Sequence, residues 1–259
     1  MALPKPLNTM KNRKLQDKPK PTLWQKLITT FPKTYVWSKR VAITLLVLFL
    51  IDLGYLIGMW PNWDLIKYGK IPESRFIETY ELKQAQNPTI PRLHWATIDF
   101  DHIPHSMIKA VLAAEDYKFF QHGGVDTEAL MRAIEYDWHK KRVVYGASTI
   151  TQQTVKNLFL SGSRNPLRKW HEYLLTFAME HYLSKKRILE IYLNDAEFGP
   201  GIFGIESAAR KYWGISAAAL TKIQAIELAA TLPAPDKHNP RTRSAFFLKQ
   251  RDKIMSNMY

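Results

Sequence analysis

The chain has 259 residues, a formal net charge of +14 and no cysteine. This length suits one good-sized domain with its own core, or two small ones. The lack of cysteine excludes disulfides, thiolate metal sites and a cysteine nucleophile, whereas the positive charge fits an anionic membrane surface, an anionic substrate or a nucleic acid.

The basic residues are concentrated at the N-terminus. Residues 1–40 contain ten Lys or Arg and a single acid, Asp17, which predicts a basic cytoplasmic tail. Residues 41–60, VAITLLVLFLIDLGYLIGMW, are almost entirely apolar. They have the length of about 20 residues that a transmembrane helix needs, so the sequence predicts one membrane span here.

The residues around this span indicate its orientation. Lys39 and Arg40 stand before it and Trp60 and Trp63 at its far end, which favours an N-terminus in the cytoplasm. A cleaved signal peptide is less favoured, because the basic region is long and no small-residue cleavage site follows. A buried core helix is the other alternative, and Asp52 is its main support. In the span, Asp52 would need interfacial water or a partner helix.

The rest of the chain is predicted to form a connector and one domain. Residues 61–92 are interpreted as a connector with short strands, because FIETYELKQA, like LHWATIDFD after it, carries weakly alternating β-formers. Residues 93–259 are predicted to be a mostly helical domain, since apolar residues recur at helical spacing. Residues suited to begin or end its helices are Asp126, Pro166, Ser184 and Gly214.

The first candidate site lies in AAEDYKFFQHGGVD. Glu115 and Asp116 are adjacent, so on a helix they point about 100° apart and cannot share one face. One can enter a cleft while the other holds the following loop. A carboxylate beside aromatic residues can have its pKa raised into the range of a proton-transfer group. The plainer alternatives are a solvated helix end and, for His122, a hydrogen-bonded turn residue.

The second candidate site is basic. In RNPLRKWHE, Arg168 and Glu172 are spaced to pair along one helix face. Arg164, Arg168 and Lys169 would bind a phosphate or pyrophosphate if they converge with Lys156; otherwise they make an ordinary surface ion pair. The other face of this helix is expected to be core and carries Trp170, Tyr173, Leu174 and Phe177.

Two more segments have unusual compositions. Residues 146–160, GASTITQQTVKNLFL, are rich in uncharged hydrogen-bonding side chains that a core helix would not need. Residues 185–194, KKRILEIYLN, are interpreted mainly as packing, with a functional role as the alternative.

In order and spacing, these segments resemble the motifs of glycosyltransferase family 51, the peptidoglycan glycosyltransferases that polymerise lipid II. AEDYKFFQHGG is similar to E-D-x-x-F-x-x-H-x-G, and GASTITQQTVKN to G-x-S-T-I-T-Q-Q-x-x-K-N. RKWHE is similar to R-K-x-x-E, and KKRILEIYLN to K-x-x-I-L-E-x-Y-L-N. A fifth motif, R-x-x-x-V-L, is only loosely similar to QRDKIM, where Gln250 replaces the arginine.

The resemblance implies a mainly α, lysozyme-like fold in two lobes with a short β element, preceded by one transmembrane helix. It implies a monofunctional enzyme that joins lipid II units by β-1,4 bonds and releases polyprenyl pyrophosphate. Glu115 would be the catalytic base, Glu172 would orient a cation or the donor, and Asp116 and His122 would support them.

The same resemblance implies two binding regions. The pyrophosphate would meet Lys156, Arg164 and Arg168, since fixed cations stabilise the charge of a leaving group. The sugars would meet Ser148, Thr149, Gln152, Gln153 and Asn157. No cofactor is expected, and no dedicated metal site is predicted, although Mg²⁺ or Mn²⁺ could arrive with the pyrophosphate.

The expected partners are lipid II, the growing glycan-lipid chain, the membrane and other cell-wall synthesis or division proteins. A nucleic acid is disfavoured, because anionic lipid lies nearest the basic tail. The catalytic domain is expected on the outer face of a bacterial cytoplasmic membrane. Two alternatives are a lysozyme-like enzyme that cleaves glycans with Glu115 as general acid, and a non-catalytic scaffold of the cell-wall machinery.

Overall fold

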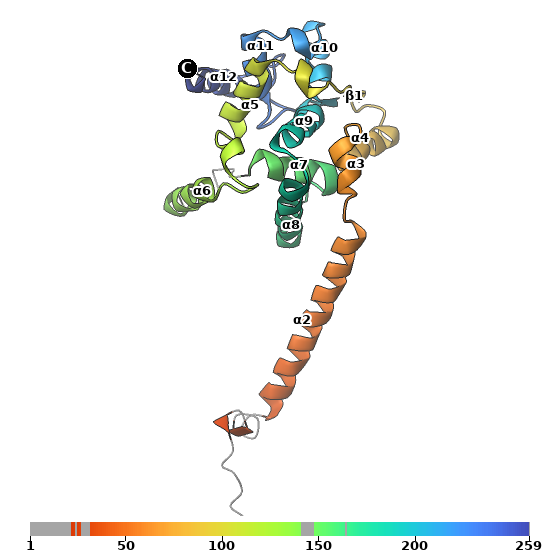
Figure 1. Cartoon of the computed structure of the whole chain (residues 1–259), viewed down its shortest axis with the longest axis vertical. Coiled ribbons are helices and arrows are strands. Elements are labelled where there is room, and N and C mark those ends of the chain that lie inside the picture. Colours follow the sequence, from red (N-terminus) through yellow and green to blue (C-terminus); the bar gives the residue numbers. More distant parts are fainter. Residues whose placement is uncertain (1–21, 24, 27–31, 141–147, 164, 259) are drawn as a thin grey trace, which may run out of the picture. The chain divides into compact units, whose positions relative to one another are not determined.

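The computed structural model describes residues 22–23, 25–26, 32–140, 148–163 and 165–258. The chain divides into two units, Met1–Gly58 and Met59–Tyr259, and each is described by itself. Figure 1 shows the helices and strands along the chain.

The first unit contains the long helix α2 (Pro32–Gly58). It begins before residue 41 because Pro32 suits a first helical turn and the following residues carry no helix breaker. Its most apolar part has a mean hydropathy of 2.4 and is almost unburied. By length and composition α2 can cross a membrane, in agreement with the predicted span. The role of Asp52 stays a prediction.

The connector is helical, so the strands predicted within residues 61–92 are wrong. It contains α3 (Trp63–Tyr68) and α4 (Arg75–Gln86), and FIETYELKQA lies in α4. The Ser74 hydroxyl caps α4 by accepting the Ile77 N–H. Glu, Leu, Lys, Gln and Ala then outweigh the few β-formers, because they are strong helix formers.

The second unit contains a small sheet, whose first strand follows the connector. It contains β1 (His94–Trp95), β2 (Glu197–Gly199) and β3 (Ile202–Phe203) in the order β1-β3-β2. The β1 strand pairs with β3 in parallel, and β2 pairs with β3 in antiparallel fashion. LHWATIDFD therefore contributes one strand of two residues. This short β element agrees with the predicted fold class.

The remaining elements of the second unit are helical. They are η1 (Phe100–His102), α5 (His105–Glu115), η2 (Phe119–Gln121), α6 (Thr127–Lys140), α7 (Ile150–Phe159), α8 (Pro166–Tyr182), α9 (Lys185–Asp195), α10 (Ile205–Trp213), η3 (Ala217–Ala219), α11 (Lys222–Thr231) and α12 (Ala245–Asn257).

The predicted helix ends are confirmed. The Asp126 carboxylate accepts the Ala129 N–H before α6, and Pro166 occupies the first turn of α8. Ser184 caps α9 by accepting the Arg187 N–H. Gly214 ends α10 in the left-handed region at φ 71°, which glycine adopts without steric cost.

Packing in the second unit is organised around two helices (Figure 1). Helix α7 packs against α8 and α9, whereas α5 packs against α11 and α12. One cluster of buried apolar residues contains members of both groups, such as Val155 and Met107. The described residues of this unit are therefore mainly helical, as predicted, while the division into two lysozyme-like lobes stays a prediction.

One expectation about the core is wrong. Trp170 and Phe177 are 48% and 56% exposed, and Tyr173 and Leu174 are only half-buried. The buried face of α8 instead carries His171, Glu172, Leu175, Thr176 and Met179. This face meets α7, and the ion pairs of Glu172 satisfy its charge there.

Candidate active site

Glu115 stands where α5 ends. Asp116 leaves the helical conformation with φ −162°, so the helix stops after Glu115. Gln153 Nε2 on α7 donates to Glu115 Oε2 at 2.7 Å. The Tyr192 hydroxyl on α9 donates to Gln153 Oε1 at 3.2 Å. This chain from three helices fixes the direction of the Gln153 amide and holds the Glu115 carboxyl group.

The electrostatic environment suits Glu115 to proton transfer. The residue is half-buried overall, but its carboxyl group is enclosed, and this burial raises the Glu115 pKa from its usual 4.5. The hydrogen bond from Gln153 and the charge of Lys156 act in the opposite direction, as each lowers the Glu115 pKa. A carboxyl group with a raised pKa at a surface opening is a candidate general base.

Asp116 has a different task from its neighbour. Its buried carboxylate accepts the Ile150 N–H at the start of α7, at 3.0 Å. The same carboxylate lies 2.9 and 3.1 Å from His122 Nε2. Asp116 thus joins the loop after α5 to the N-terminus of α7. One of the two acids was expected to hold the following loop; Asp116 is that acid, and His122 is its partner within the loop.

The N-terminus of α7 is fixed by a capping box. The Thr149 hydroxyl accepts the Gln152 N–H, and Gln152 Oε1 accepts the Thr149 N–H. The Thr149 hydroxyl also donates to Gly124 O at 2.5 Å. Thr149 and Gln152, which were expected to bind sugar, therefore hold the helix end. The T-x-x-Q spacing is the signature that the sequence interpretation missed.

Helix α8 carries a buried carboxylate, Glu172, that is paired with two cations. Glu172 is 2% exposed, and its Oε2 lies 2.6 Å from Arg168 Nη1. Lys169 Nζ binds Glu172 Oε1 and lies 3.4 Å from the exposed Ser148 Oγ. Arg168 Nε is buried and has no partner among the described residues. Two cations therefore share one carboxylate, which leaves an excess of positive charge.

Lys156 lies beside this cluster, as the sequence predicted. Burial lowers the pKa of its ammonium, while the carboxylate of Glu172 and, more weakly, that of Glu115 raise it. Its Nζ is 5.7 Å from the centre of the Phe76 ring on α4. The structure thus brings Lys156, Arg168 and Glu172 together near Glu115. Arg164 lies outside the described residues.

Asn157 follows Lys156 and faces inward. Its side chain, together with that of Ser74, lies close enough to the Asp195 carboxyl group to lower the Asp195 pKa. Asp195 is 1% exposed, and its burial outweighs these neighbours. Asp195, Tyr192 and Phe76 are site residues that the sequence interpretation missed. Tyr192 had been assigned to packing, and no sequence signal marks Phe76.

A hollow opens beside Glu115. It has a volume of about 210 Å³ and is lined by residues from α5, α6 and the start of α7, among them Glu115, Asp116, Arg132 and Ser148. A smaller cavity of about 20 Å³ is also lined by Glu115 and by Gln250 on α12. The divergent C-terminal segment therefore borders the candidate base.

Among the described residues, no group of three or more His, Asp or Glu side chains could hold a metal ion. Two acids of the site already have partners, since Asp116 binds His122 and Glu172 binds two cations. A divalent cation carried by the pyrophosphate stays a prediction.

Comparisons with known proteins show the family of the chain. Residues 84–259 match the family described as Transglycosylase. A biosynthetic peptidoglycan transglycosylase of Janthinobacterium sp. (strain Marseille) is 39% identical over 229 residues, which cover 87% of this chain and 95% of that protein. A protein of the same name from Bordetella avium (strain 197N) is 41% identical over 233 residues, or 86% of this chain and 94% of that protein. One from Laribacter hongkongensis (strain HLHK9) is 37% identical over 222 residues, covering 86% and 96%.

Proposed function

Because the chain belongs to the transglycosylase family and is a peptidoglycan glycosyltransferase, we propose that it polymerises lipid II into β-1,4 glycan strands by a base-assisted displacement. The donor is a glycan chain attached through an α-linked pyrophosphate to a polyprenyl lipid. The acceptor is the 4-hydroxyl of the GlcNAc of lipid II.

Glu115 is the general base in this proposal. Its carboxylate takes the proton of the acceptor hydroxyl while that oxygen attacks the anomeric carbon of the donor. One C–O bond forms on one face of the sugar, and the C–O bond to the pyrophosphate breaks on the other. The α linkage is therefore inverted to β, and no covalent enzyme carboxylate forms. The observation that carries this role is the enclosed carboxyl group of Glu115, whose pKa is raised by burial.

The cations of α7 and α8 take the charge of the leaving group. Lys156 and Arg168 bind the pyrophosphate oxygens. Arg164 joins them through the family motif. Glu172 holds Arg168 and Lys169 in place, so the cations are oriented before the substrate binds. Such preorganised charge stabilises a transition state without reorganisation.

The uncharged residues from Ser148 to Asn157 either contact the sugars or hold the groups around them. Ser148 is exposed at the hollow beside Glu115, where it would contact a sugar hydroxyl. Gln153 holds Glu115, and Asn157 lies beside Lys156. Thr149 and Gln152 act indirectly, because their capping box fixes the start of α7. Mg²⁺ or Mn²⁺, if used, would arrive with the pyrophosphate.

The membrane span explains how the enzyme meets its substrate. With the N-terminus inside, α2 (Pro32–Gly58) holds the catalytic domain on the outer face of the bacterial cytoplasmic membrane, where lipid II is consumed. Exposed apolar side chains on the catalytic unit favour contact with the lipid surface. They include Tyr117, Phe120, Met131, Ile134, Leu167, Trp170 and Phe177. Partners from the cell-wall machinery would bind in addition.

The test is turnover of lipid II by the purified full chain in detergent, resolved by glycan length. The wild type should give polymer and Glu115→Gln none, with Glu128→Gln, an exposed acid on α6, as the matched control. Fragments from isolated sacculi would instead support a cleaving enzyme. Normal folding and lipid II binding without any product would support a scaffold. Polymer from Glu115→Gln would refute the role of Glu115.

A further inference from the structure

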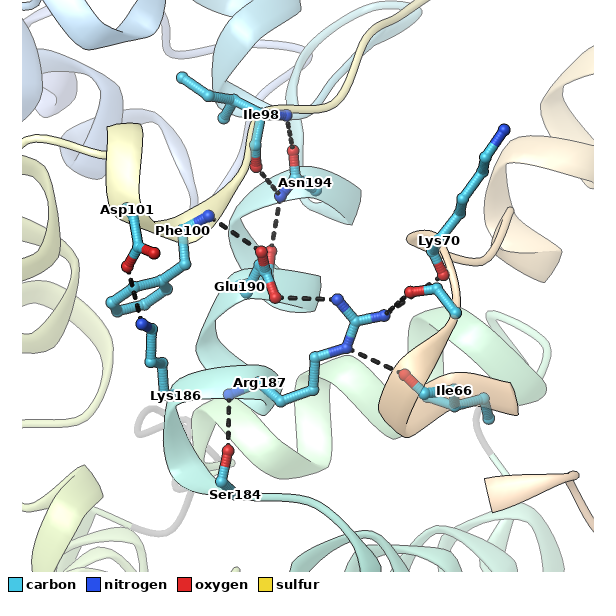
Figure 2. Close-up of polar contacts among 11 residues, drawn as sticks. Ile66, Lys70, Ile98, Phe100, Asp101, Ser184, Lys186, Arg187, Glu190 and Asn194 are labelled. Atoms are coloured by element: carbon cyan, nitrogen blue, oxygen red, sulfur yellow. Dashed lines mark hydrogen bonds and ion pairs between the residues drawn. The ribbon is translucent and has the colours of Figure 1, made fainter. Parts of the chain in front are cut away.

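Arg187 fastens the connector to α9 (Figure 2). Its guanidinium donates from Nε to Ile66 O at 2.9 Å and from Nη2 to Gly69 O and Lys70 O at 2.8 and 3.3 Å. Its Nη1 lies 2.8 Å from Glu190 Oε2. The side chain of Arg187 is only 14% exposed. One enclosed guanidinium thus satisfies three main-chain carbonyls where α3 ends.

Helix α9 also binds the main chain of Ile98 and Phe100. Glu190 Oε1 accepts the Phe100 N–H at 2.9 Å, and Asn194 exchanges hydrogen bonds with the main chain of Ile98. KKRILEIYLN is therefore more than packing. It carries a row of side chains that bind the backbone of segments distant in sequence.

Helix α3 is also packed against the catalytic helices. The Trp63 ring stacks on Tyr182 of α8, with centres 5.6 Å apart and an interplanar angle of 8°. The Trp63 ring also forms a T-shaped pair with Phe159 of α7, with centres 5.8 Å apart. Both Trp63 and Ile66 are buried. The connector is therefore part of the domain core.

The start of α4 reaches the site itself. Arg75 Nη1 donates to Phe159 O at 3.4 Å, one turn beyond Lys156. The Phe76 ring lies 5.7 Å from Lys156 Nζ, within the range of a cation–π contact. Ser74, at the N-cap of α4, is fully buried beside Asp195 and thus beside Asn157. Three consecutive connector residues therefore contact α7 or its neighbours around Lys156.

We propose that the connector from residue 63 to residue 76 is a positioning element of the catalytic centre, in which Arg187 fixes the connector on α9 and Phe76 fixes the Lys156 ammonium for the pyrophosphate. Arg187 and Phe76 are positioning residues, because they act through Lys156. This inference rests on the proposed function, since it takes Lys156 as a ligand of the pyrophosphate.

The test measures binding of farnesyl pyrophosphate to the full chain in detergent, well below the melting temperature. Arg187→Gln should weaken binding on the order of tenfold, because small displacements of a positioned group are costly. Phe76→Leu keeps apolar volume but loses the π face, and should weaken binding roughly threefold. Phe76→Tyr should restore wild-type affinity. The matched control is Lys186→Gln, which removes a neighbouring exposed cation of α9 paired with Asp101.

A second readout separates positioning from general stability. Lys156 must be protonated to bind an anion, so binding is lost as pH rises through the Lys156 pKa, which burial lowers. If Arg187→Gln frees the connector, water reaches the ammonium and the alkaline limb of binding should move to higher pH. The other charged groups around Lys156 are unchanged in this variant; they are Glu115, Arg168, Lys169, Glu172 and Asp195.

The outcomes are distinguishable. Normal affinity and an unmoved alkaline limb in Arg187→Gln would overturn the inference, even if the melting temperature fell. Equal binding by Phe76→Leu and Phe76→Tyr would also overturn it. The Lys156→Gln variant tests the role of Lys156 itself. If it binds farnesyl pyrophosphate like the wild type, the proposed role of Lys156 is itself wrong. If it binds weakly while both connector variants bind normally, only the connector inference fails.

Discussion

Asp195 should make the protein less stable as pH rises. Its carboxyl group is fully buried at the end of α9, and among the described residues neither oxygen has a hydrogen-bond partner of normal geometry. Ser74, Asn157 and Lys156 lie close enough only to moderate the effect of burial, which raises the Asp195 pKa from 3.8 to about 7. Removing this carboxyl group should therefore stabilise the fold at alkaline pH.

The direction and size of this change in the free energy of unfolding follow from proton linkage. In the unfolded chain Asp195 ionises from about pH 4, whereas in the folded chain it stays protonated until its raised pKa of about 7. The stability that the protonated form provides is complete below the unfolded value and lost as pH rises through the folded value. A shift from 3.8 to about 7 corresponds to about 4 kcal/mol above pH 8 and about 1.5 kcal/mol at pH 5.

The assay is thermal unfolding of the full chain in detergent at pH 5 and pH 8.5, for the wild type and Asp195→Asn. At pH 8.5 the variant should melt about 10 °C higher, with a clearly smaller gain at pH 5. Asp101→Asn is the control, because Asp101 is exposed and Lys186 lowers its pKa, so its effect should not change over this range. An equal gain at both pH values, or a larger gain at pH 5, would refute the reasoning.

Two further predictions concern the neighbours of the base. Glu172→Gln should destabilise the fold by about 3 kcal/mol, because it leaves two cations near a buried amide. Thermal unfolding, together with lipid II turnover, measures this loss. An unchanged melting temperature would contradict the prediction. Gln153→Leu should move the acid limb of the pH–rate profile to higher pH, since the variant removes a hydrogen bond that lowers the Glu115 pKa. A pH–rate profile with the same acid limb as the wild type would contradict this prediction.

Much of the helical domain was predictable because local signals agreed with tertiary structure. Asp126, Pro166, Ser184 and Gly214 mark helix ends by their own chemistry, and the structure uses each as expected. The connector was mispredicted because a few β-formers were given more weight than the Ser74 cap. Trp170 and Phe177 were misplaced because hydrophobicity alone suggested burial, whereas paired charge permits Glu172 to occupy the inner face.

The residue types of the site could be predicted from the sequence, but the contacts that each side chain makes could not. The spacing of Glu115 and Asp116 separates their directions, and their two sets of partners follow that separation. No local pattern could reveal that Phe76 would meet Lys156, because this contact joins segments 80 positions apart in sequence. The contacts between Arg187 and the connector could not be read from the sequence either, since the connector supplies main-chain carbonyls, which any residue type has.

In the proposed mechanism, pyrophosphate binding at Lys156 would change the pKa of Glu115. The positive charge of Lys156 lowers the Glu115 pKa in the free protein, against the larger effect of burial. A pyrophosphate bound at Lys156 would place negative charge beside that ammonium and cancel this effect. The Glu115 pKa would then rise further, which makes its carboxylate a stronger base when the leaving group is in position. Glu172 acts in the opposite direction to burial, because its negative charge raises the Lys156 pKa that burial lowers. In the proposed mechanism the cations and the base would therefore act as one electrostatic unit, to which Glu172 also contributes.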